Sequence, residues 1–177
     1  MTLQTKSSII NMRAVLLFSL LLLYSQVKAM LDYKCLKCLC KTATNCEPEP
    51  CDPKICEVST GNYDCACGYF AITPPYWMST NRPHLEKNYQ TKKDKFIDCV
   101  QSKRCSIKTV QYYMEKNAKD CDGNQVIDCD DYVLIHSFGP GNCENATLKN
   151  DKLHRYNTCM DKKDPPQPLQ NQKSHQK

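Results

Sequence analysis

The amino-acid sequence predicts a small α+β domain in which short helices surround a β-hairpin region and disulfide bonds supply much of the stability. Three observations support this class. All 14 cysteines lie after residue 29, several later segments repeat apolar residues at helical spacing, and one short segment alternates aromatic and small residues. An even set of cysteines in a short exported chain predicts up to seven disulfides, each contributing about 2–4 kcal/mol. The cysteines are Cys35, Cys38, Cys40, Cys46, Cys51, Cys56, Cys65, Cys67, Cys99, Cys105, Cys121, Cys129, Cys143 and Cys159.

The first 29 residues have the pattern of a secretory signal peptide. Lys6 and Arg13 precede the apolar run 14–23, and Val27-Lys28-Ala29 places small residues at both key positions of a cleavage site. The apolar run is about half the roughly 20 residues that a membrane-spanning helix needs. We therefore expect a secreted, extracellular protein that begins near Met30 and has no membrane span.

Removal of the leader also removes most of the surplus charge. The formal charge of the whole chain is +5, and three basic residues but no acid precede residue 30, which leaves about +2. So small a surplus does not predict a nucleic-acid partner or strong membrane binding. Residues 30–160 suit one domain, which we expect to be monomeric. The polar segment 161–177 has three prolines and one large apolar residue, and it predicts a disordered tail.

The first half of the domain is expected to be compact and irregular. The spacing of leucine and cysteine predicts a helix over 31–41, and the prolines and cysteines of 47–60 predict a disulfide-held loop. Alternation over 63–72 predicts a strand or hairpin, with Gly68 in a special backbone conformation. Pro74-Pro75 ends this segment and precedes a buried helical turn.

The second half is expected to be helical after an exposed charged loop over 84–95. Residues 106–119 place apolar side chains on one face and predict the clearest amphipathic helix. Shorter helices are predicted over 131–138, where Gly139-Pro140-Gly141 follows, and over 148–160.

Four stretches occur in the same order as motifs of one known family. They are C-L-K-C-L-C-K at 35–41, C-G-Y-F-A-I-T-P-P-Y-W at 67–77, V-Q-Y-Y-M at 110–114 and C-D-D-Y-V-L-I-H-S-F-G-P-G-N-C at 129–143. Together they resemble the invertebrate-type lysozyme, or destabilase, family. The resemblance implies a lysozyme-like fold and a glycosidase of antibacterial defence or digestion. Its implied partner is peptidoglycan or a related polymer of β-1,4-linked amino sugars.

The cysteines depart from the family pattern in pairs. Thr80 and Thr109 stand where the family usually has cysteines, whereas Cys56 and Cys65 are additional. Because an unpaired loss or gain would leave a free thiol, the resemblance implies that one bridge was lost and that Cys56–Cys65 was gained. The remaining connectivity stays open at this point.

The resemblance implies that both family carboxylates are replaced in this chain. A retaining glycosidase needs a proton donor and a second carboxylate roughly 5–5.5 Å away. The resemblance places the family's glutamic acid at Ala43 and its aspartic acid at Gly61. It therefore implies weak or lost muramidase activity. The alternative is an active lysozyme with substitute carboxylates from the 47–64 loop, for which the candidates are Glu47, Glu57 and Asp64.

Other family features are expected to survive. The aromatic side chains Tyr69, Phe70, Tyr76 and Trp77 are candidates for stacking on sugar rings, together with His136, although Trp77 is equally suited to a core position. The destabilase branch is also credited with isopeptidase activity, and Ser79 and His136 are candidates for such a nucleophile and base. Packing of His136 against the turn that follows it is the structural alternative.

Two further motifs carry expectations. Asp120, Asp122, Asn124, Asp128 and Asp131 have the spacing of calcium ligands, but Gln125 replaces the usual glycine and a solvated acidic turn is the alternative. We expect no other cofactor. Asn145-Ala146-Thr147 is a predicted N-glycosylation site, at Asn145.

Overall fold

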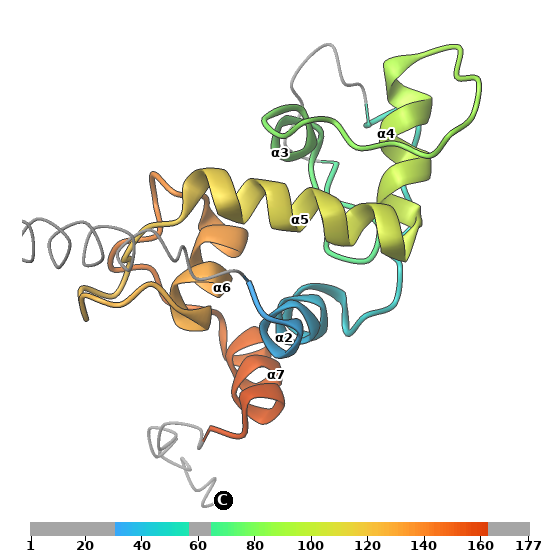
Figure 1. The fold of residues 1–177 in the computed structure, drawn as a ribbon. Helices are drawn as coiled ribbons and strands as arrows, with labels where there is room; N and C mark the ends of the chain where they lie inside the picture. The colour runs from blue at the N-terminus through green and yellow to red at the C-terminus, as the bar shows by residue number, and fades with distance from the viewer. Residues whose placement is uncertain (1–30, 57–64, 163–177) are drawn as a thin grey trace, which may run out of the picture. The chain divides into compact units, whose positions relative to one another are not determined.

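The computed structural model describes residues 31–56 and 65–162. The predicted signal peptide lies outside the described residues, as do the segment 57–64 and all but two residues of the predicted tail. Six helices are described: α2 (Tyr33–Thr44), α3 (Pro74–Met78), α4 (Lys92–Gln101), α5 (Lys103–Asn117), α6 (Cys129–Phe138) and α7 (Asn150–Met160) (Figure 1). Within this described part, no helix is both long and apolar enough to cross a bilayer.

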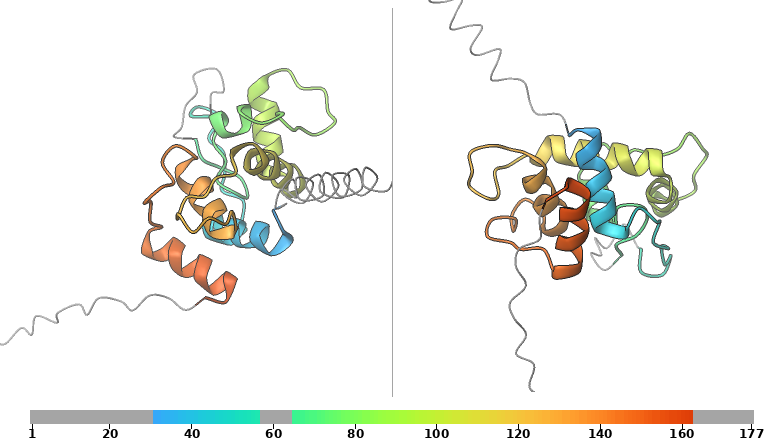
Figure 2. Two further views of the ribbon diagram at one scale, coloured as in Figure 1. Left: turned by 60° about the vertical axis from the view of Figure 1, so that its left-hand side comes forward. Right: turned by 90° about the horizontal axis from the view of Figure 1, so that it is seen from below.

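The helices pack in pairs around a common core. The first and last described helices, α2 and α7, lie side by side in each view, although they are far apart in sequence (Figures 1 and 2). Helix α5 contacts α3 and α4, which precede it, and α6, which follows it, so it joins the earlier helices to the later ones. The largest fully buried side chains include Trp77, Phe70, Phe96 and Leu39. This core is small, which is why the disulfides matter for stability.

The helix predicted over 31–41 is confirmed, and it extends to Thr44. The carboxylate of Asp32 caps it by accepting a 2.6 Å hydrogen bond from the amide of Cys35. It ends at Asn45, which adopts the left-handed conformation with φ 58°. This exact end matters because Ala43 lies in the last turn of α2.

The charged segment 84–95 is not entirely a loop. Helix α4 begins at Lys92, and the Thr91 side chain caps it by accepting from the amide of Asp94 at 3.1 Å. The apolar residues that hold this helix, Phe96, Cys99 and Val100, follow the charged segment. The helix start was not predicted because its first turn is charged and lacks apolar residues.

The predicted hairpin is reduced to isolated bridges. Antiparallel bridges pair Glu49 with Gly68 and Cys67 with Ile72, and the described residues contain no longer strand. Gly68 has φ +75°, as the sequence predicts for a special backbone position, and a Cβ atom there would lie 2.1 Å from the carbonyl oxygen of Val100. Only glycine permits this close approach.

All 14 cysteines are paired, which confirms the prediction of seven disulfides. Cys56 bonds to Cys65, as the resemblance implied. Two bridges fasten α2 to distant segments, Cys35–Cys129 to the start of α6 and Cys38–Cys159 to α7. The other bridges are Cys40–Cys46, Cys51–Cys67, Cys99–Cys105 and Cys121–Cys143.

Candidate functional site

A cleft of about 450 Å³ opens where five helices and the bridged segment 66–73 converge. Its volume falls in the range of about 300–1,000 Å³ that is usual for ligand pockets. The residues that line it are Ala43, Ala66, Phe70, Ala71, Thr73, Pro75, Tyr76, Ser79, Tyr113, Ile135, His136, Ser137, Phe138, Gly139 and Lys152.

Ala43 forms part of the cleft wall. It lies between Thr42 and Thr44, two buried residues whose hydroxyl groups fix the end of α2. The hydroxyl of Thr42 donates to the carbonyl oxygen of Cys38, and that of Thr44 donates to the carbonyl oxygen of Tyr69, both at 2.7 Å. These two bonds hold the end of α2 in place, and residue 43 contributes a methyl group to the cleft wall.

The substitute carboxylates fall in two groups. Glu47 is exposed, lies beyond the end of α2 and is not among the residues that line the cleft. The other two candidates, Glu57 and Asp64, lie outside the described residues, as does Gly61, the position where the resemblance expects the family's aspartic acid. In the described part of the cleft the lining includes no carboxylate, and the charged side chain there is Lys152.

His136 lies on the cleft wall and joins three segments. Its Nε2 is 2.8 Å from the carbonyl oxygen of Phe70, which can only accept, so Nε2 carries the proton. Its Nδ1 is 3.1 Å from the hydroxyl group of Tyr76 and must accept from it. Burial of the imidazole lowers the pKa of His136 to about 4; the Phe70 carbonyl opposes this shift, and the charge of Lys152 adds to it. His136 is thus a neutral link between α6, α3 and the bridged segment.

Ser79 and His136 both line the cleft, but their hydrogen bonds lead elsewhere. The Ser79 hydroxyl donates to the carbonyl oxygen of Tyr76 at 2.8 Å, at the end of α3. The acceptor nitrogen of His136 is the one occupied by the Tyr76 hydroxyl. A nucleophile needs its proton taken by a base, and the structure gives these two groups different partners.

The aromatic candidates differ in accessibility. Phe70 and Trp77 are each 1% exposed. Burial favours the core alternative for Trp77, which does not line the cleft, whereas Phe70 forms part of the cleft lining. Trp77 donates from Nε1 to the carbonyl oxygen of Pro83 at 2.9 Å and packs edge-on against Phe96. Tyr69 is partly buried and is not among the residues that line the cleft. Tyr76 lines the cleft and is partly exposed.

The lining residues that sequence reasoning missed include Tyr113 and Lys152. The ring of Tyr113 stacks on that of Tyr76, with centroids 3.5 Å apart and planes 14° from parallel. The helical periodicity of α5 placed residue 113 on the inward face, which was the available signal. Lys152 carries no motif, because its place in the cleft depends on how α7 packs.

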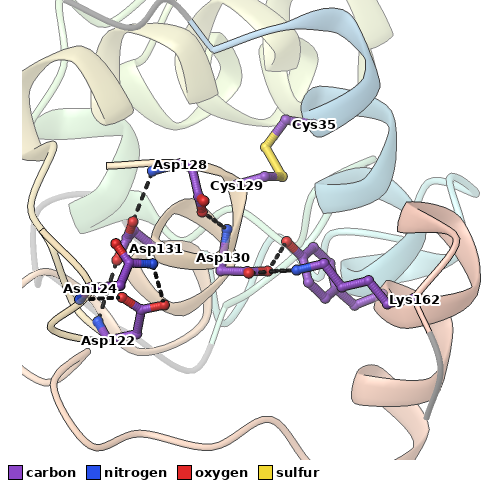
Figure 3. A network of polar contacts seen from close by, with 9 residues as sticks. Cys35, Asp122, Asn124, Asp128, Cys129, Asp130, Asp131 and Lys162 are labelled. Atoms are coloured by element: carbon purple, nitrogen blue, oxygen red, sulfur yellow. Dashed lines mark hydrogen bonds and ion pairs between the residues drawn. A yellow bond between two sulfur atoms is a disulfide. The ribbon is translucent and has the colours of Figure 1, made fainter. Parts of the chain in front are cut away.

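The acidic loop before α6 uses its carboxylates to bind its own backbone (Figure 3). Asp131 is fully buried and accepts from the amides of Cys121 at 2.6 Å and Asp128 at 2.8 Å. Asp120 accepts from the amides of Gln125 and Gly123, and these bonds lower its pKa. Oxygen atoms of Asp120, Asp122 and Asp131 lie within 4.8 Å of one another.

The two remaining calcium candidates also have local partners. Asp128 caps α6 by accepting from the amide of Asp130 at 2.8 Å, and Asn124 accepts from the amide of Val126 at 2.7 Å. The amides account for this cluster of oxygen atoms by ordinary turn and capping chemistry. Asn145, the predicted glycosylation site, is exposed and has φ 58° in a turn.

Asp130 holds the start of α6 against the end of α7 (Figure 3). Its carboxylate accepts from the hydroxyl group of Tyr156 at 2.6 Å and pairs with Lys162. Burial alone would raise the pKa of Asp130, but the bonds from Lys162 and Tyr156 outweigh it and leave the pKa lowered. Together with the Cys35–Cys129 disulfide, these contacts fix α6 and therefore the position of His136.

Comparison with known proteins bears out the resemblance. A sequence model described as Destabilase matches residues 32–159. The chain belongs to the destabilase family. An invertebrate-type lysozyme of Ruditapes philippinarum is 32% identical over 121 residues, which cover 68% of this chain and 76% of that protein. A lysozyme of Meretrix lusoria is 27% identical over 134 residues, which cover 73% of this chain and 93% of that protein.

Comparison with solved structures confirms the lysozyme-like fold. A chain in the crystal structure of Aeromonas hydrophila PliI in complex with Meretrix lusoria lysozyme matches with a TM-score of 0.51 and 24% identity. The match covers 75% of this chain and 90% of that chain. It supports the predicted lysozyme-like fold, in which helices predominate and extended structure is limited to short bridges.

Proposed function

We propose that this member of the destabilase family is a secreted protein of antibacterial defence or digestion that binds peptidoglycan-type sugar polymers without efficient cleavage. One observation carries the proposal. Ala43 lies on the wall of the cleft, at the position where the family resemblance expects the acid, and the described lining offers no carboxylate. Loss of a general acid costs roughly 10²–10⁴-fold in rate.

The cleft is otherwise suited to hold a sugar chain. Its lining combines the aromatic residue Tyr76, which is partly exposed as a whole, with the hydroxyl groups of Thr73, Ser79 and Ser137. Aromatic faces and hydroxyl groups are the usual partners of sugar rings and their hydroxyls. Lys152 adds a positive charge that favours ligands with acidic groups, such as the free carboxylates of the peptides attached to the sugar chain.

The experiment measures release of new reducing ends from purified peptidoglycan by oxidatively refolded protein. We expect no release by the natural protein and measurable release by the A43E/G61D double variant, which restores both family carboxylates. A matched A43Q/G61N variant adds side chains of similar size without acids and should stay inactive. Sedimentation of the natural protein with insoluble peptidoglycan at micromolar concentration tests binding directly.

Opposite results would be equally informative. Release by the natural protein would refute the proposal and favour an active lysozyme, with substitute carboxylates among Glu47, Glu57 and Asp64. Absence of sedimentation with peptidoglycan would refute the binding role. An isopeptidase assay on a γ-glutamyl-lysine substrate, with Ser79→Ala as the comparison, tests the remaining alternative.

A further inference from the structure

A second groove lies between α2 and α7 and shares no lining residue with the cleft. Its volume is about 450 Å³, and it is lined by Lys37, Lys41, Asn45, His154, Arg155, Thr158, Cys159 and Asp161. The two helices that form its walls lie side by side (Figures 1 and 2). We propose that this groove binds a saccharide unit that carries an oxyanion group, namely a sulfate ester, a phosphate ester or a carboxylate.

The groove has a surplus of positive charge. Lys37 and Lys41 are four residues apart, so they lie on the same face of α2, and Arg155 faces them from α7. The acid in the lining, Asp161, already pairs with Lys34 at 3.0 Å. Lys41 donates to the neutral side-chain oxygen of Asn45 at 3.1 Å, which leaves its charge uncompensated by that contact.

Arg155 has a hydrogen-bond donor that its contacts within the described residues do not use. Its Nη2 atom donates to the carbonyl oxygen of Thr42 at 3.1 Å and lies 3.4 Å from the exposed carboxylate of Asp151. Its Nε is buried without a hydrogen-bond partner among the described residues, although the side chain as a whole is 34% exposed. A buried donor without a partner costs about 1–3 kcal/mol. A small movement of the guanidinium group toward a bound oxyanion would satisfy this donor, and its planar fork suits such a group.

The groove is also rigid and large enough for a sugar ring. The Cys38–Cys159 disulfide joins its two walls, and Cys159 itself forms part of the lining. A volume of about 450 Å³ exceeds the needs of a single ion. Asn45 and Thr158 supply an amide and a hydroxyl group that can bind sugar hydroxyls beside the charged group. Because the disulfide already holds the two walls together, binding needs only the adjustment of Arg155 and the surface lysine side chains.

The test is a titration of the full-length, isotopically labelled protein followed by amide NMR shifts. The probes are glucose 6-sulfate, glucose 6-phosphate and glucuronate, with uncharged glucose as the control, at low ionic strength. We expect saturable shifts in α2 and α7 with at least one charged probe and none with glucose. The probe that binds most tightly identifies the oxyanion. Salt should weaken the binding, because exposed charges are screened over about 8 Å at physiological ionic strength.

Two paired variants separate a specific groove from general positive charge. K37Q/K41Q removes two charges from the groove and should weaken the affinity for the best probe at least about tenfold, which corresponds to about 1.4 kcal/mol. K103Q/K108Q removes two exposed charges from α5, outside the groove lining, and should change affinity less than about twofold. Equal weakening by both variants, or shifts confined to residues outside α2 and α7, would overturn the proposal. Neither result depends on whether the cleft binds peptidoglycan.

Discussion

Replacement of His136 by glutamine should flatten the dependence of stability on pH in the acid range. The folded protein holds the imidazole neutral between the Phe70 carbonyl and the Tyr76 hydroxyl, and burial lowers its pKa from 6.5 to about 4. In the unfolded chain the same ring takes up a proton near pH 6.5. Between these two values the unfolded state binds more protons than the folded state, so acid destabilises the fold.

The size of the effect follows from the shift. The contribution of His136 is fully present above pH 6.5 and is lost as the pH falls toward 4. At about 1.4 kcal/mol for each pH unit, the loss would be about 3 kcal/mol. The ring is only partly removed from solvent, so we expect a measured value of about 2–3 kcal/mol.

The assay is urea unfolding with the disulfides intact, from pH 7.5 to pH 3.5, for the natural protein and for H136Q. The variant is expected to be less stable at neutral pH but to lack this part of the pH slope. H84Q, which removes a histidine from an exposed loop, is the control and should retain the natural slope. Coincident pH profiles for the natural protein and H136Q would refute the reasoning, as would an NMR titration that places the pKa of His136 near 6.5.

Three further predictions concern the scaffold. Gly68→Ala should destabilise the fold by about 3 kcal/mol or more in denaturant unfolding, because its Cβ would lie 2.1 Å from the Val100 carbonyl oxygen at φ +75°; a loss below about 1 kcal/mol would contradict that contact. Asp131→Asn should lower the free energy of unfolding by about 2–3 kcal/mol, because the new NH₂ group would face a backbone N–H that now donates to the carboxylate. An unchanged free energy of unfolding would mean that those hydrogen bonds are absent. Calcium at millimolar concentration should shift the melting temperature by less than about 1 °C, since the loop carboxylates already bind amides; a saturable rise in melting temperature would instead establish a calcium site.

The sequence predicts the helices best where apolar residues repeat at helical spacing. The helices predicted over 31–41 and 106–119 both appear, as Tyr33–Thr44 and Lys103–Asn117, so the periodicity locates each helix but not its ends. The start of α4 was missed because its first turn is charged, and only the capping hydroxyl of Thr91 marks it. The hairpin was overestimated because alternation over 63–72 reflects two tight bridges around Gly68, not a ladder of strands.

The candidate site was partly predictable for a different reason. The family motifs singled out four residues that do line one cleft, because members of a family that share motifs also share the fold that brings them together. These residues are Ala43, Tyr76, Ser79 and His136. The rings of Phe70 and Trp77 could not be assigned from motif alone, since an aromatic beside a cleft and an aromatic beneath it have the same sequence pattern. Lys152 enters the cleft only through the packing of α7, and no local pattern records that contact.

The Cys38–Cys159 bridge spans 121 residues and joins the first described helix to the last. Nearly the whole domain is therefore a covalently closed ring. A bacterial or digestive protease that cuts one peptide bond within this ring opens it but releases no fragment, because both pieces remain joined through sulfur. The nicked protein would migrate as one species on a non-reducing gel and separate only after reduction. Survival of a first cut as one covalent molecule is a property that the folding energy alone would not supply.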